Sequence, residues 1–282
     1  MKILNPLYDW AFKYLMENND LAKRFLSLIL KKNVTHLETR NIELPLLKEK
    51  NPFLSRFDFN AIIEEENENK KVLIELQKYK HPDPISRFRT YLGENYIKEE
   101  SYKDPQGKAQ KGSLPLIAVY ILGYCPPEFK MPYIIVKNKI YDGVNDEELN
   151  IKSPMTELLA HSIYFLITTP PKDYQWRGTP QEAVIRLFRQ KAKLAEQNRI
   201  YELKDTPQDQ TVNDLANYLH QGTQDPFIVK QLKAEEEYIE AIGDLEISLA
   251  EAQKREAEAQ KREVEAQKRE AEERKQREAA QK

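Results

Sequence analysis

The chain has 282 residues, 40% of them hydrophobic, which is enough apolar material to fold around a core of its own. Its 44 basic and 46 acidic residues balance to a net charge of -2, which excludes recruitment of an anionic partner by bulk charge alone. The single cysteine, Cys125, excludes an internal disulfide, and the four histidines are too far apart for a zinc site of the usual spacing.

Neither a secretory signal nor a membrane span is expected. Asn5-Pro6 and Asp9 follow the initial Met-Lys-Ile-Leu directly, where a signal peptide would continue with apolar residues. The longest apolar stretch, residues 114–124, is far shorter than the roughly 20 residues that cross a bilayer. We therefore expect a cytoplasmic protein without a membrane partner.

Two amphipathic helices are predicted at the start of the chain. Asn5 is suited to an N-cap and Pro6 to the first turn of a helix that reaches about Asn18. After Asp20 as a second cap, apolar residues recur at helical spacing to about Lys31.

Three strands are predicted next, at residues 38–47, 56–63 and 72–77. The acidic run at residues 64–70 predicts the turn of a hairpin between the last two strands.

A helix and a further strand follow the hairpin. Helical spacing begins at Pro84 and continues to about Tyr102, with Gly93 inside it, which suggests a close approach to a sheet. Residues 114–122 predict a buried strand. The expected order is α-β-β-β-α-β, an α/β fold with a mixed sheet flanked by helices.

The second half of the chain predicts further elements. They are a strand at residues 133–141, a segment at 156–167 that fits either helix or strand, a helix at 181–201 and a shorter helix within 205–225.

Residues 232–282 differ in kind, because they are highly charged and end in repeats of seven residues. Each repeat places Glu three and four residues before Lys and Arg, as in Glu251 with Lys254 and Arg255, which supports a lone helix. We favour a long solvated helix. The alternative is a coiled coil in which the apolar stripe of residues 232–250 pairs with a second copy of the chain.

Two acidic residues interrupt apolar strands. Asp58 lies between phenylalanines, and Glu75 lies between Ile and Leu with Gln77 on the same strand face. Two carboxylates close together on paired strands repel unless a cation such as Mg²⁺ lies between them. The alternative is structural: Asp58 pairs with Arg56 or Arg87, and Glu75 faces solvent.

Several stretches resemble one nuclease family. They are residues 5–15 (NPLYDWAFKYL), 56–59 (RFDF), 74–78 (IELQK), 87–96 (RFRTYLGENY), 162–165 (SIYF) and 187–190 (LFRQ). Together they resemble the PD-(D/E)XK nuclease family transposases, also described as recombination-promoting nucleases. The resemblance covers roughly residues 3–240 and implies a restriction-endonuclease-like core of the order predicted above.

The resemblance also implies site residues. Asp58 matches the motif acid and Glu75 the second acid, and both would bind Mg²⁺ or Mn²⁺. Gln77 stands where many nucleases of this fold have Lys, although the family commonly shows this Glu-x-Gln form. Asp9 matches an acid that the first helix presents to the same site; alternatively it complements the helix dipole and pairs with Lys13.

Four basic residues are candidates for contacts with DNA phosphates. Arg87 and Arg89 open the helix after the motif, and Lys78 and Lys80 follow Gln77. Strand alternation directs Lys78 to the face opposite Gln77. For Arg87 and Arg89 the alternative is that they are ordinary solvated arginines.

Together with the resemblance, the sequence predicts a metal-dependent DNA endonuclease; the link to recombination or transposition is implied by the resemblance alone. Its parts are a nuclease core at residues 1–125, an α/β extension at 126–231 and the charged helix at 232–282. One alternative is a catalytically impaired relative that binds DNA or assembles through its C-terminal helix. In another, that helix is itself the functional part, as a spacer or an oligomerisation arm.

Overall fold

The computed structural model describes residues 1–40, 59–65, 68–78, 84–104, 106–188 and 199–238. The chain forms two compact units, Met1–Lys233 and Ala234–Lys282. Of the second unit, residues 234–238 are described, and they are helical. Everything below concerns the first unit.

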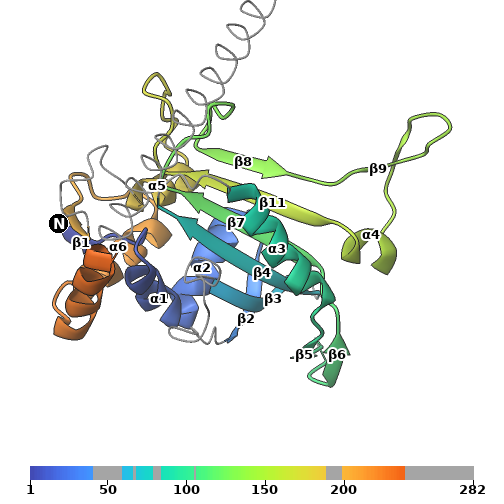
Figure 1. Cartoon of the computed structure of the whole chain (residues 1–282), viewed down its shortest axis with the longest axis horizontal. Coiled ribbons are helices and arrows are strands. Elements are labelled where there is room, and N and C mark those ends of the chain that lie inside the picture. Colours follow the sequence, from blue (N-terminus) through green and yellow to red (C-terminus); the bar gives the residue numbers. More distant parts are fainter. Residues whose placement is uncertain (41–58, 66–67, 79–83, 105, 189–198, 239–282) are drawn as a thin grey trace, which may run out of the picture. The chain divides into compact units, whose positions relative to one another are not determined.

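A mixed sheet of six strands forms the centre of the first unit (Figure 1). In spatial order the strands are β2 (Val34–Arg40), β3 (Phe59–Glu65), β4 (Glu68–Gln77), β7 (Leu116–Leu122), β11 (His161–Ile167) and β8 (Tyr133–Val136). β2, β3 and β4 are antiparallel to one another, β4, β7 and β11 are parallel, and β8 returns antiparallel to β11. The expectation of an α/β fold with a mixed sheet is confirmed.

Burial on both faces explains the sequence of the central strands. All seven residues of β7, Leu-Ile-Ala-Val-Tyr-Ile-Leu, are buried, as are residues 71–77 of β4. Parallel strands covered on both faces have near-continuous apolar runs of this kind, whereas a half-exposed strand alternates. The polar residues in β4 are therefore exceptions that need a local reason.

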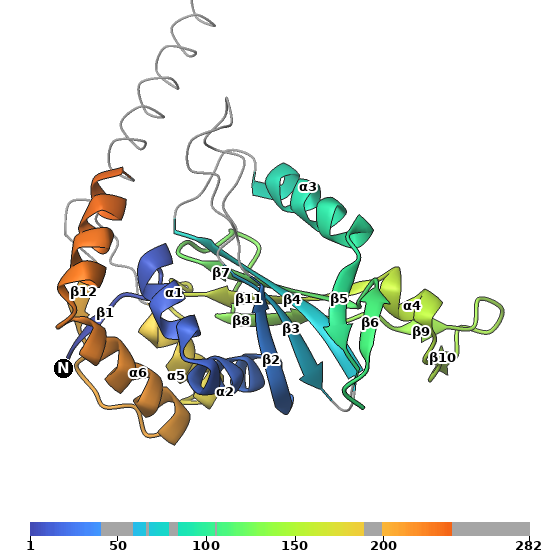
Figure 2. The ribbon, with the colours of Figure 1, turned by 90° about the horizontal axis from the view of Figure 1, so that it is seen from below.

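Helices cover both faces of the sheet (Figure 2). α3 (Pro84–Ile97) lies on one face, and α1 (Asp9–Glu17), α2 (Asn19–Leu30), α5 (Pro180–Leu187) and α6 (Gln210–Gly222) gather on the other. None of the helices in the described ranges combines the length and the apolar character needed to cross a membrane.

The larger core lies between the sheet and the four helices. Phe12 of α1 is at its centre, because its ring contacts those of Phe25, Phe59 and Phe188 at centroid distances of 6.1, 6.2 and 6.1 Å. All four rings are buried. Residues far apart in the sequence are joined here by apolar burial, the main favourable contribution to folding.

Short elements complete the unit. β1 (Lys2–Leu4) pairs with β12 (Ile200–Glu202), β5 (Glu100–Lys103) with β6 (Ala109–Gly112), and β9 (Ile140–Tyr141) with β10 (Glu148–Leu149), all antiparallel, and α4 (Pro154–Leu158) precedes β11.

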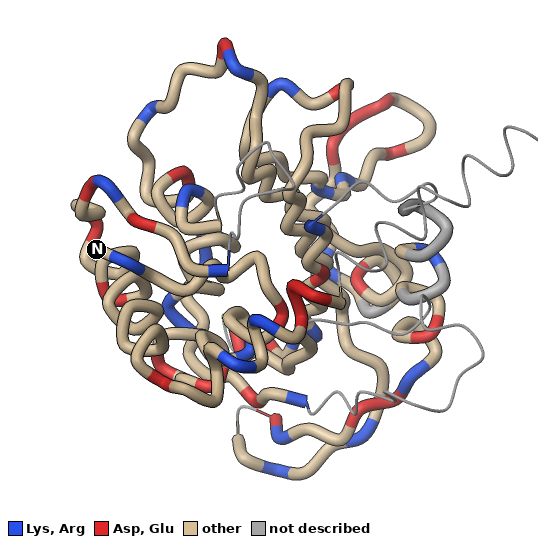
Figure 3. The backbone as a smooth tube through the Cα atoms, turned by 60° about the vertical axis from the view of Figure 1, so that its left-hand side comes forward, with Lys and Arg blue, Asp and Glu red and all other residues tan. Residues whose placement is uncertain are grey.

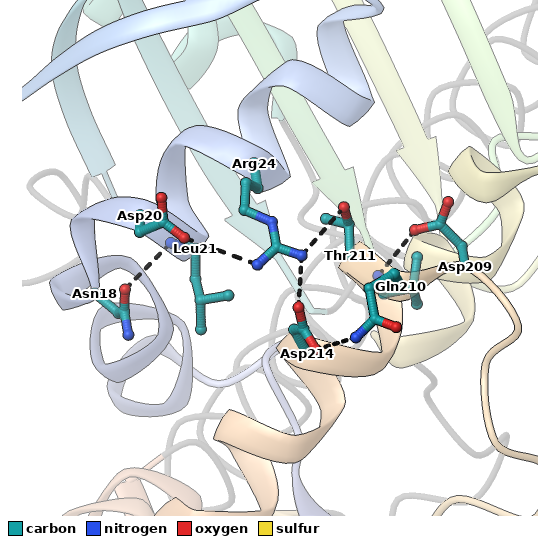
Figure 4. A network of polar contacts seen from close by, with 9 residues as sticks. Asn18, Asp20, Leu21, Arg24, Asp209, Gln210, Thr211 and Asp214 are labelled. Carbon is teal, nitrogen blue, oxygen red and sulfur yellow. Dashed lines mark hydrogen bonds and ion pairs between the residues drawn. The ribbon is translucent and has the colours of Figure 1, made fainter.

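Basic and acidic residues are interspersed along the described backbone (Figure 3). One local network of polar side chains ties α6 to the neighbouring helix α2 (Figure 4). The Arg24 guanidinium donates to Asp214 Oδ2 at 2.6 Å and lies 3.8 Å from Asp20. The hydrogen bond from Arg24 is the largest cause that lowers the pKa of Asp214. Because the Arg24 and Asp214 side chains are each about one-third exposed, we attribute positioning rather than large stability to this pair.

The predicted α-β-β-β-α-β order is present as α1 and α2, β2, β3, β4, α3 and β7, with β5 and β6 inserted before the last strand. Two predicted caps are wrong. α1 starts at Asp9 with Tyr8 as its N-cap, because the Asn5 side chain instead accepts a hydrogen bond from Leu7 N in the preceding turn. α2 is capped by Asn18, which accepts from Leu21 N, and Asp20 lies inside the helix.

The predicted hairpin turn at residues 64–70 is too long. β3 runs to Glu65 and β4 begins at Glu68, because the buried Glu65 carboxylate is paired with Lys32 and with Lys70. Paired charges let acidic residues remain in strands that their composition disfavours. The helix from Pro84 also ends at Ile97 rather than near Tyr102, where β5 pairs with β6.

The later predictions were coarse. The strand expected at 133–141 is divided into β8 and β9, and the ambiguous segment at 156–167 ends in the strand β11. The helix expected at 181–201 is α5, which ends at Leu187, and its last predicted residues form β12. α6 fulfils the helix expected within 205–225. The heptad repeats and most of residues 232–250 lie outside the described residues.

Two helical glycines meet different surroundings. A Cβ at Gly93 of α3 would have no atom within 4 Å, so the close approach that we expected there is wrong. A Cβ at Gly222 of α6 would lie 2.5 Å from Leu4 Cδ1 and 2.7 Å from Tyr14 Cε1. Tyr14 is itself stacked on Tyr218 with ring centroids 4.6 Å apart, so it has little room to move.

We predict that Gly93→Ala raises the free energy of unfolding by about 0.8 kcal/mol, since alanine is the better helix former. Gly222→Ala should lower it by about 1–2 kcal/mol, because overpacking outweighs the gain in propensity. Urea denaturation of both variants tests this pair, and equal effects of the two substitutions would contradict it.

Candidate functional site

The carboxyl ends of three parallel strands are level with one another. Gln77 of β4 is the register partner of Leu122 of β7, which is in turn the partner of Ile167 of β11. The pattern continues past the strands, since Gly123 N donates to Gln77 O at 2.8 Å and Thr168 N donates to Leu122 O at 2.9 Å. This edge of the sheet is where open α/β sheets usually bind their ligands.

Glu75 and Gln77 point to the face that α3 covers. Alternation along β4 places them on the same face as Leu73, which packs with Leu92 and Tyr96 of α3. Glu75 is 2% exposed and Gln77 is 5% exposed. A carboxylate at such depth is costly to desolvate, which excludes the alternative in which Glu75 faces solvent.

Tyr120 lies beside Glu75, as its register partner on β7. Its ring is 4.2 Å from that of Phe88 of α3, measured between centroids. Burial first, and the charge of Glu75 second, raise the pKa of the Tyr120 hydroxyl well above its usual range. Tyr120 is therefore a neutral neighbour of Glu75 at any pH at which the protein would work.

Gln77 is held by a residue that the sequence analysis did not identify. The Tyr124 hydroxyl donates to Gln77 Oε1 at 3.0 Å. Among the described residues, the buried Nε2 of Gln77 has no hydrogen-bond partner. The Tyr124 bond uses one of the two lone pairs of the amide oxygen, so the wholly unpartnered group that Gln77 can offer to a ligand is its N–H donor.

The other predicted acids and bases are placed less completely. Asp58 and Lys80 lie outside the described residues, as does the side chain of Arg87, whose backbone belongs to α3. Arg89 is exposed on α3.

Lys78 lies on the face opposite Gln77, as strand alternation requires. Its Nζ is 3.3 Å from the centre of the Tyr8 ring, and Tyr8 belongs to the core under α1. This contact brings the start of α1, including the half-exposed Asp9, to the carboxyl end of β4. Asp9 thus approaches this edge from the face opposite Glu75. Lys13, which we considered as its partner, lies over the Trp10 ring at 5.8 Å.

The donors around Glu75 and Gln77 decide whether a metal ion could bind at this edge. Within the described ranges, no group of three or more His, Cys, Asp or Glu side chains is placed to bind a metal ion. Glu75 offers one buried carboxylate suited to a hard cation, whereas the Gln77 oxygen is already bonded to Tyr124. The donor set therefore fits Mg²⁺ or Mn²⁺ only when Asp58 supplies a second carboxylate.

Comparison with known proteins gave no further guidance: no family model, curated protein or solved structure matches the chain.

A hydrogen bond between Tyr96 and His161 holds α3 at the end of the sheet opposite to Gln77. The Tyr96 hydroxyl bonds to His161 Nδ1 and so ties the C-terminal half of α3 to β11. Burial lowers the pKa of His161, so the neutral ring is favoured in the folded protein. Protonation of His161 is therefore disfavoured in the folded protein.

We predict that acid weakens the fold through His161. A histidine whose folded pKa is depressed contributes stability that is complete above its unfolded pKa, about 6.5, and is lost as the pH falls through the folded value. Chemical denaturation between about pH 7 and about pH 5 should show a smaller loss of stability in His161→Gln than in wild type. His36→Gln, at an exposed position of β2, should keep the wild-type slope. Identical slopes in all three proteins would contradict the link.

Proposed function

We propose that the chain is a divalent-metal-dependent DNA endonuclease that hydrolyses phosphodiester bonds at the carboxyl edge of β4. One observation carries the proposal. A buried carboxylate, Glu75, and a buried amide with a free donor, Gln77, lie on one face of β4 where three parallel strands end. Such groups are costly to bury and are retained where they bind or react.

The second acid of the proposal is Asp58, the residue before β3. Phe59 is the register partner of Ile74 in the antiparallel ladder. One further pair in the same register would join Asp58 to Glu75, and the proposal depends on that pair. Directly opposed positions on antiparallel strands are about 5 Å apart, close enough for two carboxylates to share one cation.

In this proposal Asp58 and Glu75 bind Mg²⁺ or Mn²⁺. The ion supplies Lewis-acid polarisation of the phosphate and lowers the pKa of a bound water. Gln77 Nε2 donates to the attacking water or to a phosphate oxygen and thereby orients it. Because the amide is uncharged, it orients without the charge that a Lys in its place would add. Tyr124 is a positioning residue, since it fixes which end of the amide faces the site.

The basic candidates have secondary roles. Arg89, which is exposed on α3, would bind a phosphate on the face of the sheet that α3 covers. Arg87 is a second candidate for this role from the resemblance alone. Lys78 rests on Tyr8 and would reach the DNA only from the opposite face. Lys80 remains a candidate for a phosphate contact. Asp9 is a candidate third acid from the resemblance alone, because it approaches the edge from the face opposite Glu75. Since charges of both signs are interspersed, such local contacts must supply the affinity.

The biological setting of the proposal rests on the resemblance alone. It is recombination or transposition on cytoplasmic DNA, with residues 232–250 as a means of self-association. The alternative is a protein of this fold that has lost nuclease activity and keeps DNA binding or assembly. The first experiment distinguishes this inactive protein from an active nuclease.

Supercoiled plasmid incubated with the purified protein and Mg²⁺ should be nicked, and EDTA should prevent nicking. Asp58→Asn and Glu75→Gln, which keep the side-chain shapes, should each lower the rate about 10²-fold or more, because each removes a charge that holds the metal. Glu94→Gln, at an exposed position of α3, is the matched control and should retain activity. Failure of folded wild type to cleave with either metal would overturn the proposal in favour of binding or assembly.

Tyr124→Phe tests the orientation of Gln77. Loss of the hydroxyl frees the amide to rotate, so kcat should fall roughly 10-fold while KM for the DNA changes little. Gln77→Leu should cost at least as much, and the double variant should be no worse than Gln77→Leu alone. Additive losses would show that Tyr124 acts independently of Gln77.

A further inference from the structure

A cleft of about 870 Å³ opens on the face of the sheet opposite Glu75. Its walls come from the segment that follows β11, from α5, and from the segment between β12 and α6. The volume is within the range of small-molecule and nucleotide sites, roughly 300–1,000 Å³. Among the described residues, neither Glu75 nor Gln77 lines it.

The aromatic wall of the cleft is rigid. Trp176 is 39% exposed, but Tyr174 before it and Arg177 after it are both hydrogen-bonded to the buried carboxylate of Glu182. Glu182 accepts hydrogen bonds from the Tyr174 hydroxyl at 2.5 Å, from Arg177 N at 2.8 Å and from Thr179 N at 3.2 Å. The Tyr174 ring meets the Trp176 ring edge-on, with centroids 5.5 Å apart. A partly exposed indole fixed in this way offers a preorganised surface for stacking.

Polar groups surround the indole. The Arg186 guanidinium lies 5.8 Å from the centre of the Trp176 ring and 3.9 Å from Asp205, where both charged groups are more than half exposed and so pair weakly. Lys172 and Lys204 also line the cleft, and within the described part of the chain neither forms an ion pair. The lining also contains three carboxylates, Glu202, Asp205 and Asp209, so an anionic ligand would be held by individual cations and not by a net positive charge.

The wall also contains an unsatisfied hydroxyl. Thr168 lines the cleft and is 6% exposed, and its Oγ1 has no hydrogen-bond partner among the described residues. A buried hydroxyl without a partner costs free energy, which a ligand that bonds to it would recover. This is an independent indication that the cleft receives a polar ligand.

These groups favour a nucleotide over a proline-rich peptide. Peptides of that kind also dock in aromatic-lined grooves, but here the Tyr174 and Tyr201 hydroxyls already donate to Glu182 Oε1 and to Leu187 O, which leaves fewer donors for peptide carbonyl groups. An aromatic face next to several cations is instead the usual arrangement for single-stranded nucleic acid, because every base can stack and every phosphate is charged. Bases inside a duplex do not offer their faces, so the nucleotide must be unpaired.

The cleft also begins at the sheet edge that ends in Gln77. Thr168 follows β11, two strands from Gln77, which corresponds to roughly 10 Å across the sheet. We propose that the cleft binds an unpaired nucleotide of a DNA strand by stacking on Trp176, with Arg186, Lys172 and Lys204 at its phosphates. This rests on the proposed function for the choice of DNA. The preferred substrate is then DNA with a single-stranded segment beside the cleaved bond.

Trp176 fluorescence tests the stacking directly. Trp10→Phe leaves Trp176 as the only tryptophan of the full-length chain. Titration with an oligothymidylate of about ten nucleotides in EDTA should quench this fluorescence, since the base stacks on the indole. In anisotropy measurements with the labelled oligonucleotide, Trp176→Ala and Arg186→Ala should each weaken binding roughly 10-fold. Tyr141→Ala, at an exposed position of β9, should not.

Absence of quenching, or equal binding by Trp176→Ala and Tyr141→Ala, would overturn the inference. Quenching by an oligoproline peptide and not by the oligonucleotide would also overturn it and assign the cleft to a peptide. Because these measurements need no metal, plasmid cleavage without oligonucleotide binding would leave the proposed nuclease intact. Oligonucleotide binding without any plasmid cleavage would support the nucleotide cleft and overturn the proposed nuclease.

Discussion

Burial of β4 on both faces is the constraint on which the rest of the structure depends. A slip of β4 by one residue would turn Glu75, Gln77 and Lys78 to the opposite faces of the sheet, because side chains alternate along a strand. The register with β7 therefore fixes Glu75 and Gln77 under α3, and fixes Lys78 against Tyr8 at the start of α1. The chemistry of the site follows from this register more than from any single contact.

The same burial obliges polar residues of the sheet to find partners. At the amino end of β4, Lys71 Nζ lies 2.5 Å from Glu100 Oε1, with side chains 1% and 7% exposed. Burial lowers the pKa of Lys71, and the hydrogen bond to Glu100 counteracts that effect. At the carboxyl end Gln77 is bonded to Tyr124 through its oxygen while its amide nitrogen stays available. One end of the strand is a closed ion pair, and the other end retains a donor for a ligand.

The sequence predicted those features that depend on local pattern. Seven consecutive apolar residues identify β7, and an acid and an amide inside an apolar strand identify Glu75 and Gln77. Features that depend on long-range contacts were missed. β1 and β12 have three residues each and lie about two hundred residues apart in the sequence. The turn before β4 was predicted too long, because Glu65 is paired with Lys32, which lies between α2 and β2, and the local pattern does not show this contact. Tyr124 becomes recognisable only once β7 is known to lie beside β4, since it then follows the neighbouring strand end.

If both proposals hold, the cleft at Trp176 gives the same sheet edge a second role. Strand ends of parallel sheets collect loops, and here the segment after β11 contributes a fixed aromatic ring while β4 contributes the proposed reacting groups. A substrate strand passing over the edge would contact both faces. That arrangement would select DNA by its single-stranded part and not by its sequence.

In the proposed function, Asp58 and Glu75 share one divalent cation. Titration of the metal-free full-length protein with Mn²⁺, followed by electron paramagnetic resonance of the free ion, measures this without relying on turnover. We expect the wild-type protein to bind Mn²⁺, Asp58→Asn and Glu75→Gln each to lose this binding, and Glu94→Gln to keep it. Binding that persists in either of the first two variants, or no binding by wild type, would contradict it.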